Sequence, residues 1–133
     1  MFRPSKPCGG KRNSLPLIFS LLFFGWPGAV FAANDTNPYT GDPKAIAEGH
    51  DLFLSNGCYS CHGHKAEGAV GPDLTDDVWV FKPTDRTLFK TIAKGRKGTV
   101  MVAWGKQISH DQIWKIIAWI RSIYRGDPKK IVW

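Results

Sequence analysis

Two cysteines separated by two residues and followed at once by a histidine occur in the middle of the chain, as Cys58-Tyr59-Ser60-Cys61-His62. This spacing is typical of covalent haem attachment, in which each thiol forms a thioether with the haem and the histidine binds the iron. A thioredoxin-like redox pair or half of a zinc site is the alternative, but the first needs a βαβ context and the second needs four N or S ligands. The sequence contains neither. The motif therefore predicts one haem c, attached through Cys58 and Cys61, with His62 as an iron ligand.

The first 32 residues have the features of an export signal. Four basic residues and no acidic residue precede an apolar run over 15–30 that contains two prolines. This run is shorter than the roughly 20 apolar residues that a membrane span needs, so we expect the signal to be removed rather than kept as an anchor. Cleavage is expected after Ala32, or after Ala33. The sequence therefore predicts an exported, periplasmic protein without stable membrane insertion.

Removal of the signal leaves about 100 residues, the size of one small domain. Cys8 leaves with it, so both remaining cysteines belong to the motif and no disulfide is expected. Fourteen basic and 11 acidic residues remain, so the net charge of +7 falls to +3 and gives little support to a nucleic-acid partner. We expect a flexible lead over 33–41, one domain over 42–127 and a C-terminal tail over 128–133.

The apolar residues of the mature chain recur at helical spacing. Asp42-Pro43 matches an N-cap followed by proline, and predicts a helix that ends near Asn56. Asp85 is expected to cap a second helix, which stops at Gly95. Glycines and a proline between 63 and 72 predict a loop.

The most clearly marked helix lies near the C-terminus. Ser109 and Gln112 match a capping box at its start, and Gly126 marks its end. Its expected apolar stripe consists of Ile113, Ile116, Ile117, Ile120 and Tyr124.

Residues 42–126 resemble class I c-type cytochromes. Gly49, followed by Phe53, is similar to that family's N-terminal helix contact, where a glycine lets the C-terminal helix cross closely. The resemblance implies that Trp119 or Ile120 fills this crossing. It also implies an all-α, cytochrome c-like fold, with three to five helices and loops wrapped around one covalently bound haem.

Two loops extend the resemblance. Gly71-Pro72-Asp73-Leu74 is similar to the family's proximal loop, which implies that the Pro72 carbonyl accepts the Nδ1 proton of His62. Val100-Met101-Val102-Ala103-Trp104-Gly105 is similar to its distal segment, which implies that Met101 is the sixth iron ligand. A core-filling methionine is the alternative. Val102 stands where the family usually has proline, so this loop is expected to be less rigid.

A methionine opposite a histidine raises the reduction potential of haem iron, and it fills the position where oxygen or peroxide would bind. This ligand pair predicts an electron carrier rather than an enzyme. Trp79 and Trp104 are expected either to line the haem pocket, with an indole N–H available to a propionate, or to pack in the core.

Four basic residues bracket the methionine loop, and they are expected either to steer an acidic redox partner or to form a solvated charged face. They are Lys94, Arg96, Lys97 and Lys106.

The segment Tyr124-Arg125-Gly126-Asp127-Pro128 and the spacing of Trp79 resemble cytochromes c that serve quinoprotein alcohol or methanol dehydrogenases. The resemblance implies that electrons arrive from a PQQ-dependent dehydrogenase and pass to another cytochrome or a terminal oxidase. Two alternatives stay open. One is a haem enzyme or ligand sensor in which Met101 is labile, and the other is a haem subunit of a larger dehydrogenase complex.

Overall fold

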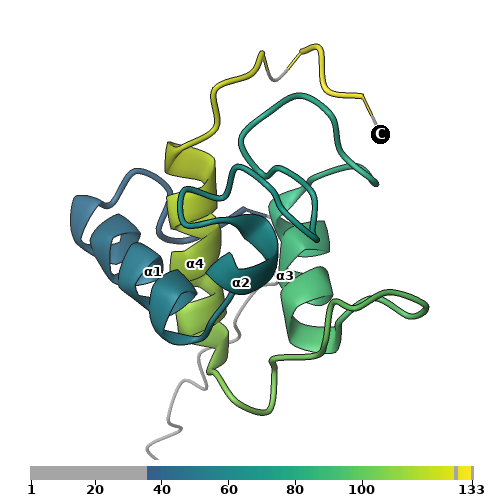
Figure 1. Cartoon of the computed structure of the whole chain (residues 1–133). Helices are drawn as coiled ribbons and strands as arrows, with labels where there is room; N and C mark the ends of the chain where they lie inside the picture. Colours follow the sequence, from purple (N-terminus) through teal and green to yellow (C-terminus); the bar gives the residue numbers. More distant parts are fainter. Residues whose placement is uncertain (1–35, 128, 133) are drawn as a thin grey trace, which may run out of the picture. The chain divides into compact units, whose positions relative to one another are not determined.

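This computed structural model describes residues 36–127 and 129–132, which contain four helices joined by loops (Figure 1). They are α1 (Pro43–Ser55), α2 (Tyr59–His62), α3 (Asp85–Lys94) and α4 (His110–Ser122). Within these residues, extended pairing is limited to one isolated bridge between Val78 and Val132. The predicted all-α fold is confirmed. The predicted export signal over 1–32 lies outside the described residues.

The first helix begins where the sequence predicts. The Asp42 carboxylate accepts hydrogen bonds from the backbone N–H groups of Lys44 and Ala45, at 2.9 and 3.2 Å, and Pro43 is the first helical residue. These bonds satisfy N–H groups that have no partner within the helix. Asn56, the predicted end of the helix, is its C-cap residue.

The crossing of α1 and α4 depends on the absence of a side chain at Gly49. A β-carbon at this position would lie 2.0 Å from the carbonyl oxygen of Lys115, so any larger residue would push the two helices apart. The backbone of α4 at Lys115 therefore lies directly against Gly49. Beside this contact, the Trp119 side chain packs on α1 as the resemblance implies, with its ring 4.9 Å from that of His50 and 4.5 Å from that of Phe53 between centroids.

The third helix begins one residue earlier than predicted. The Thr84 hydroxyl accepts a hydrogen bond from the Thr87 N–H at 3.1 Å, so Thr84, and not Asp85, is the N-cap. Asp85 is the first helical residue, where its carboxylate accepts from the Arg121 Nε at 2.8 Å. This bond ties the start of α3 to α4.

The last helix starts in the predicted capping box. Ser109 N–H donates to the Gln112 side-chain oxygen at 2.8 Å, and Gln112 N–H donates to the Ser109 hydroxyl at 3.2 Å. The four isoleucines of the predicted stripe are buried. The helix ends at Ser122, before the predicted Gly126, so Tyr124 lies beyond it.

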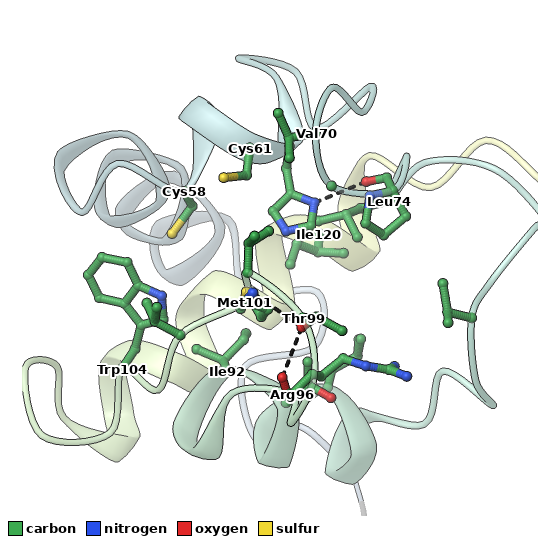
Figure 2. A pocket seen from close by; sticks show the side chains of 18 of the residues that line it. Cys58, Cys61, Val70, Leu74, Ile92, Arg96, Thr99, Met101, Trp104 and Ile120 are labelled. Carbon is green, nitrogen blue, oxygen red and sulfur yellow. Dashed lines mark hydrogen bonds between the residues drawn. The ribbon is translucent and has the colours of Figure 1, made fainter.

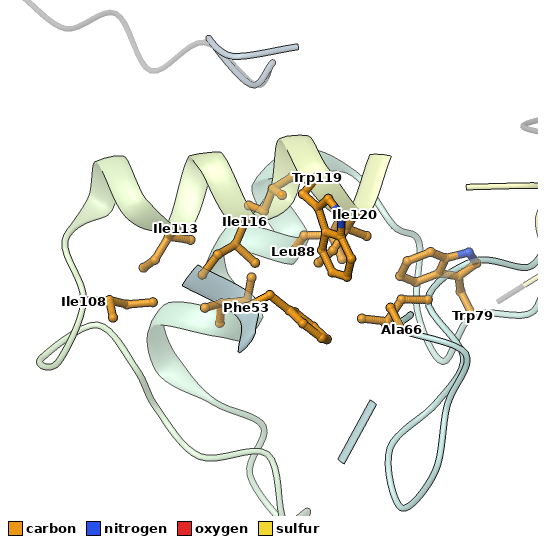
Figure 3. Packing of buried hydrophobic residues seen from close by; sticks show 12 residues of the cluster. Phe53, Ala66, Trp79, Leu88, Ile108, Ile113, Ile116, Trp119 and Ile120 are labelled. Carbon is orange, nitrogen blue, oxygen red and sulfur yellow. The ribbon is translucent and has the colours of Figure 1, made fainter. Parts of the chain in front are cut away.

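One apolar cluster joins the helices to the loops (Figure 3). Its most deeply buried large side chains are Phe53 of α1 and Ile113, Ile116 and Ile117 of α4. Leu88 of α3 adds to it. Since α4 packs against both α1 and α3, it fixes the positions of the loops that these helices carry.

The N-terminal segment that the sequence predicts to be a flexible lead, over 33–41, is attached to the helices in its described part. Asn37 is only 4% exposed. Its N–H donates to the Asp85 carboxylate at 3.0 Å, and its side-chain amide donates to the Trp114 carbonyl at 2.8 Å. The Tyr39 hydroxyl also donates to the Asp111 carboxylate. These bonds join residues far apart in sequence, which explains why local sequence patterns do not reveal them.

The chain after α4 returns to the loop that precedes α3. The Val132 N–H donates to the Asp77 carbonyl, and the Trp79 N–H donates to the Val132 carbonyl, both at 2.8 Å. The Arg125 N–H donates to the Thr75 carbonyl at the same distance. The described part of the predicted tail over 128–133 therefore supports the backbone of Trp79.

The contact between Tyr124 and Asp77 predicts that the protein loses stability at alkaline pH. Burial, the hydrogen bond to Asp77 and nearby carboxylates raise the pKa of Tyr124 to about 12. A raised phenol pKa contributes stability that is complete below the unfolded pKa of about 10 and is lost as pH rises through about 12. We expect denaturant unfolding to show a fall in stability between these values that is smaller in Tyr124→Phe. The same pH dependence in both proteins would contradict this.

Candidate haem-binding site

The motif cysteines and histidine lie on a helix of four residues, α2, which the sequence does not predict. Cys58 is its N-cap residue, and Cys61 and His62 lie within it. Gly57 and Gly63 flank it with φ angles of +74° and +80°, in the left-handed region that glycine adopts without strain. The short helix directs both thiols to the wall of the same cavity.

The loop from 63 to 74 wraps around His62. Its ring Nδ1 lies 3.0 Å from the Pro72 carbonyl oxygen, so the structure contains the predicted hydrogen bond. Since a carbonyl can only accept, Nδ1 carries the proton and Nε2 keeps its lone pair. A β-carbon at Gly71 would lie 2.8 Å from the His62 Cε1, which is why glycine is needed where the loop passes the ring.

The environment of the cysteines argues against the alternative readings of the motif. Burial raises the pKa of the Cys58 thiol to about 11, and Cys61 raises it further, against a backbone hydrogen bond that lowers it. Redox pairs of the thioredoxin kind instead depend on a thiolate with a lowered pKa. In the part of the chain that the structure describes, no three His, Cys, Asp or Glu side chains are arranged to hold a metal ion.

A cavity of about 430 Å³ lies between α2, α3, α4 and the loops. This volume is within the roughly 300–1,000 Å³ of cofactor sites. Cys58, Cys61 and His62 line it from α2 and its N-cap, and Met101 lines it from the loop that follows α3. Figure 2 shows the two cysteines and Met101 around the same pocket. The candidate ligands, separated by about 40 residues of sequence, are thus brought together.

The two tryptophans predicted at the pocket both line the cavity, but only one retains a donor. The Trp79 indole N–H donates to the Asp76 carbonyl at 3.0 Å. Its donor is therefore engaged within the protein, and Trp79 takes the other role that the sequence allowed, packing in the core. Within the described residues, the Trp104 indole N–H has no partner. Trp104 keeps its predicted donor role as a proposal.

Sequence reasoning missed four valines that line the cavity. Each of them is 60–75% exposed. We call them the valine rim: Val70, Val80, Val100 and Val102. Val70 precedes Gly71-Pro72 in the sequence, and Val100 and Val102 flank Met101, whereas nothing in the sequence links Val80 to them. Arg96 also lines the cavity, with its guanidinium 4.5 Å from the centre of the Phe81 ring.

A helical domain in which a C-x-x-C-H segment, a carbonyl-bound histidine and a methionine all reach one apolar cavity has the arrangement of a c-type cytochrome. The donor set fits haem c, since the cavity offers two thiols, an imidazole nitrogen with a free lone pair and a thioether. The chain belongs to the family described as cytochrome C oxidase, cbb3-type, subunit III, whose model matches residues 44–120. It carries one haem c, attached through Cys58 and Cys61.

The chain is similar to two groups of known proteins. It is 37% identical to cytochrome c-L of Methylorubrum extorquens, over 77% of this chain and 52% of that protein. The crystal structure of cytochrome CL from Methylophaga aminisulfidivorans shares its fold with a TM-score of 0.69 and 38% identity, over 74% of this chain and 65% of that one. The cbb3-type cytochrome c oxidase subunit FixP of Bradyrhizobium sp. (strain ORS 278) is 37% identical, over 80% of this chain and 40% of that protein.

These relatives are longer than the region that they share with this chain. The chain spans about half the length of the Methylorubrum protein and less than half of the FixP protein. Among the described helices, none is long and apolar enough to cross a membrane.

Proposed function

We propose that this protein is a periplasmic one-electron carrier, not an enzyme, whose haem iron is bound by His62 and Met101. The observation that carries the proposal is that both side chains line one apolar cavity together with the attachment cysteines. The haem supplies the chemistry, a reversible change of iron by one electron. Its donor would be a PQQ-dependent alcohol or methanol dehydrogenase, and its acceptor another cytochrome or a terminal oxidase.

The residues of this chain hold and insulate the redox centre. The Pro72 carbonyl fixes the tautomer and the ring plane of His62, so that Nε2 is the nitrogen that meets the iron. Met101 would supply its thioether to the iron, a ligand that favours the reduced state. Trp79 excludes water with its ring, and Trp104 lies beside the methionine loop with a free indole donor.

Similarity to the two cytochromes cL, one of them from a methylotrophic bacterium, supports a methanol dehydrogenase as donor. The test is stopped-flow mixing of the mature, haem-loaded protein with a purified, reduced PQQ-dependent methanol dehydrogenase. We expect rapid one-electron reduction at one haem per chain. No reduction by this enzyme, combined with rapid reduction by another periplasmic donor, would reject the donor but keep the carrier role.

The valine rim and the cations near it form the surface where a redox partner is proposed to dock. Exposed apolar patches mark interaction sites, and surrounding charge increases the rate of association. Lys94, Lys97 and Lys106 are exposed near the methionine loop.

We expect the triple variant Lys94→Gln/Lys97→Gln/Lys106→Gln to be reduced by an acidic partner about tenfold more slowly at low ionic strength, because steering charge is lost. High salt should remove most of the difference. A control with the same charge loss elsewhere is Lys44→Gln/Lys129→Gln/Lys130→Gln. Equal rates for the two triple variants at low salt would show that the position of the charges does not matter.

A second candidate is an electron-relay domain of a cbb3-type oxidase, which the family model and the FixP similarity favour. This role predicts that the protein is oxidised by, and co-purifies with, a cbb3-type oxidase. Oxidation by the oxidase without reduction by the methanol dehydrogenase would select this candidate.

A further inference from the structure

The loop that carries Met101 is closed by hydrogen bonds that meet at Thr99. The Arg96 N–H donates to the Met101 carbonyl at 3.0 Å, and the Thr99 N–H donates to the Arg96 carbonyl at 3.1 Å. The Thr99 hydroxyl donates to the same carbonyl at 2.9 Å, and it accepts from the Met101 N–H at 3.2 Å. The bonds at Thr99 can be followed in Figure 2. One hydroxyl therefore links the start of the loop to the backbone of Met101.

The end of α3 holds the same loop. A β-carbon at Gly95 would lie 2.7 Å from the Met101 carbonyl oxygen, and the φ angle of Gly95 is +66°. Beyond Met101, the Trp104 N–H donates to the Ile92 carbonyl at 3.0 Å. The Gly105 N–H likewise donates to the Ala93 carbonyl at 3.0 Å. The last carbonyls of a helix have no partner within the helix, so they are available for this purpose.

These bonds have a special importance because residue 102 is valine. A proline at this position would fix its own φ and restrict the residue before it, which is Met101. Val102 provides neither constraint. We infer that Thr99 is a positioning residue, which holds the backbone of Met101 so that its sulfur stays directed into the cavity. The inference rests on the proposed role of Met101 as an iron ligand.

The test replaces the threonine by an isosteric residue without a hydroxyl, in the haem-loaded protein. In Thr99→Val, imidazole added to the oxidised protein should displace Met101 at about tenfold lower concentration, equivalent to about 1.4 kcal/mol. The variant loses both hydrogen bonds of the hydroxyl, the one to the Arg96 carbonyl and the one from the Met101 N–H. The measurement of displacement is the loss of the methionine–iron charge-transfer band at the red end of the absorption spectrum. Thr99→Ser keeps the hydroxyl and should behave like the parent.

Thr40 provides a matched control. Its N–H and hydroxyl both donate to the carbonyl three residues before it, at 3.3 and 3.0 Å, as those of Thr99 do, and it is also exposed. Thr40→Val should therefore lose the same kind of turn bond without any change in imidazole affinity.

The outcomes separate the inference from the assignment on which it rests. A parent protein without the charge-transfer band would overturn the assignment of Met101 and the inference with it. A parent with the band, but equal imidazole affinities for Thr99→Val and the parent, would overturn the role of Thr99 alone. If Thr40→Val raised the affinity for imidazole as much as Thr99→Val, the role of Thr99 would also be rejected. The effect would then come from a general loosening of the protein.

Discussion

Replacing Met101 by alanine should open the sixth coordination position of the iron and lower the reduction potential. The expected fall is an appreciable part of the roughly 0.8 V over which axial ligands tune haem iron, because a thioether stabilises the reduced state. The reduced variant should bind CO rapidly, whereas the parent should not. The measurements are a redox titration and CO binding followed by absorbance.

The neighbouring Val100 supplies the control for this variant. It lies next to Met101 and lines the same cavity, but it has no donor atom in its side chain. Val100→Ala should leave both the potential and the slow CO binding almost unchanged. If Met101→Ala also changed neither, Met101 would be a packing residue, and the alternative of a core-filling methionine would hold. Rapid CO binding by the parent would instead favour a ligand sensor or haem enzyme.

Replacing Gly49 by alanine should strongly destabilise the fold. Helix propensity alone predicts the opposite, since alanine is favoured over glycine by about 1 kcal/mol in a helix. The new β-carbon, however, would meet the Lys115 carbonyl oxygen at 2.0 Å, and backbone cannot move aside as a flexible side chain can. We expect a loss of about 3 kcal/mol or more, as in severe overpacking. That loss corresponds to a fall in Tm of ~12 °C or more for a domain of this size.

The sign of the change in stability shows whether helix propensity or the clash with the Lys115 carbonyl dominates. The reverse substitution at an exposed position of the same helix, Ala47→Gly, should cost only about 0.5–1 kcal/mol. Thermal unfolding of both variants, followed by helical circular dichroism, is the measurement. A Gly49→Ala protein as stable as the parent would mean that α1 and α4 do not cross as closely as described.

Local chemistry accounts for what the sequence could predict. The caps at Asp42 and Ser109 involve neighbours within three residues, and the haem motif is contiguous. The errors in the predicted helices, at the start of α3 and at α2, also have local causes. Thr84 and Asp85 are both good capping residues, so sequence alone placed the start of α3 one residue too late. The four residues of α2 are too few to show a periodic pattern.

Contacts over long sequence separations could not be predicted. The bond between Asn37 and the Trp114 carbonyl spans 77 residues, and nothing in the N-terminal segment indicates it. The sequence left the Trp79 indole N–H open between a propionate and the core, and only the fold shows that a turn of backbone brings the Asp76 carbonyl to it. The valines of the rim have ordinary β-branched side chains, and only the fold shows that they gather at one opening.

The two ends of α3 have different neighbours, and this arrangement gives the helix a mechanical role. Asp85 at its first turn is joined to Asn37 and to Arg121, while Ile92 and Ala93 at its last turn hold the methionine loop. A ten-residue helix is a stiff rod about 15 Å long. The N-terminal segment and the methionine loop are therefore anchored at opposite ends of one rigid element.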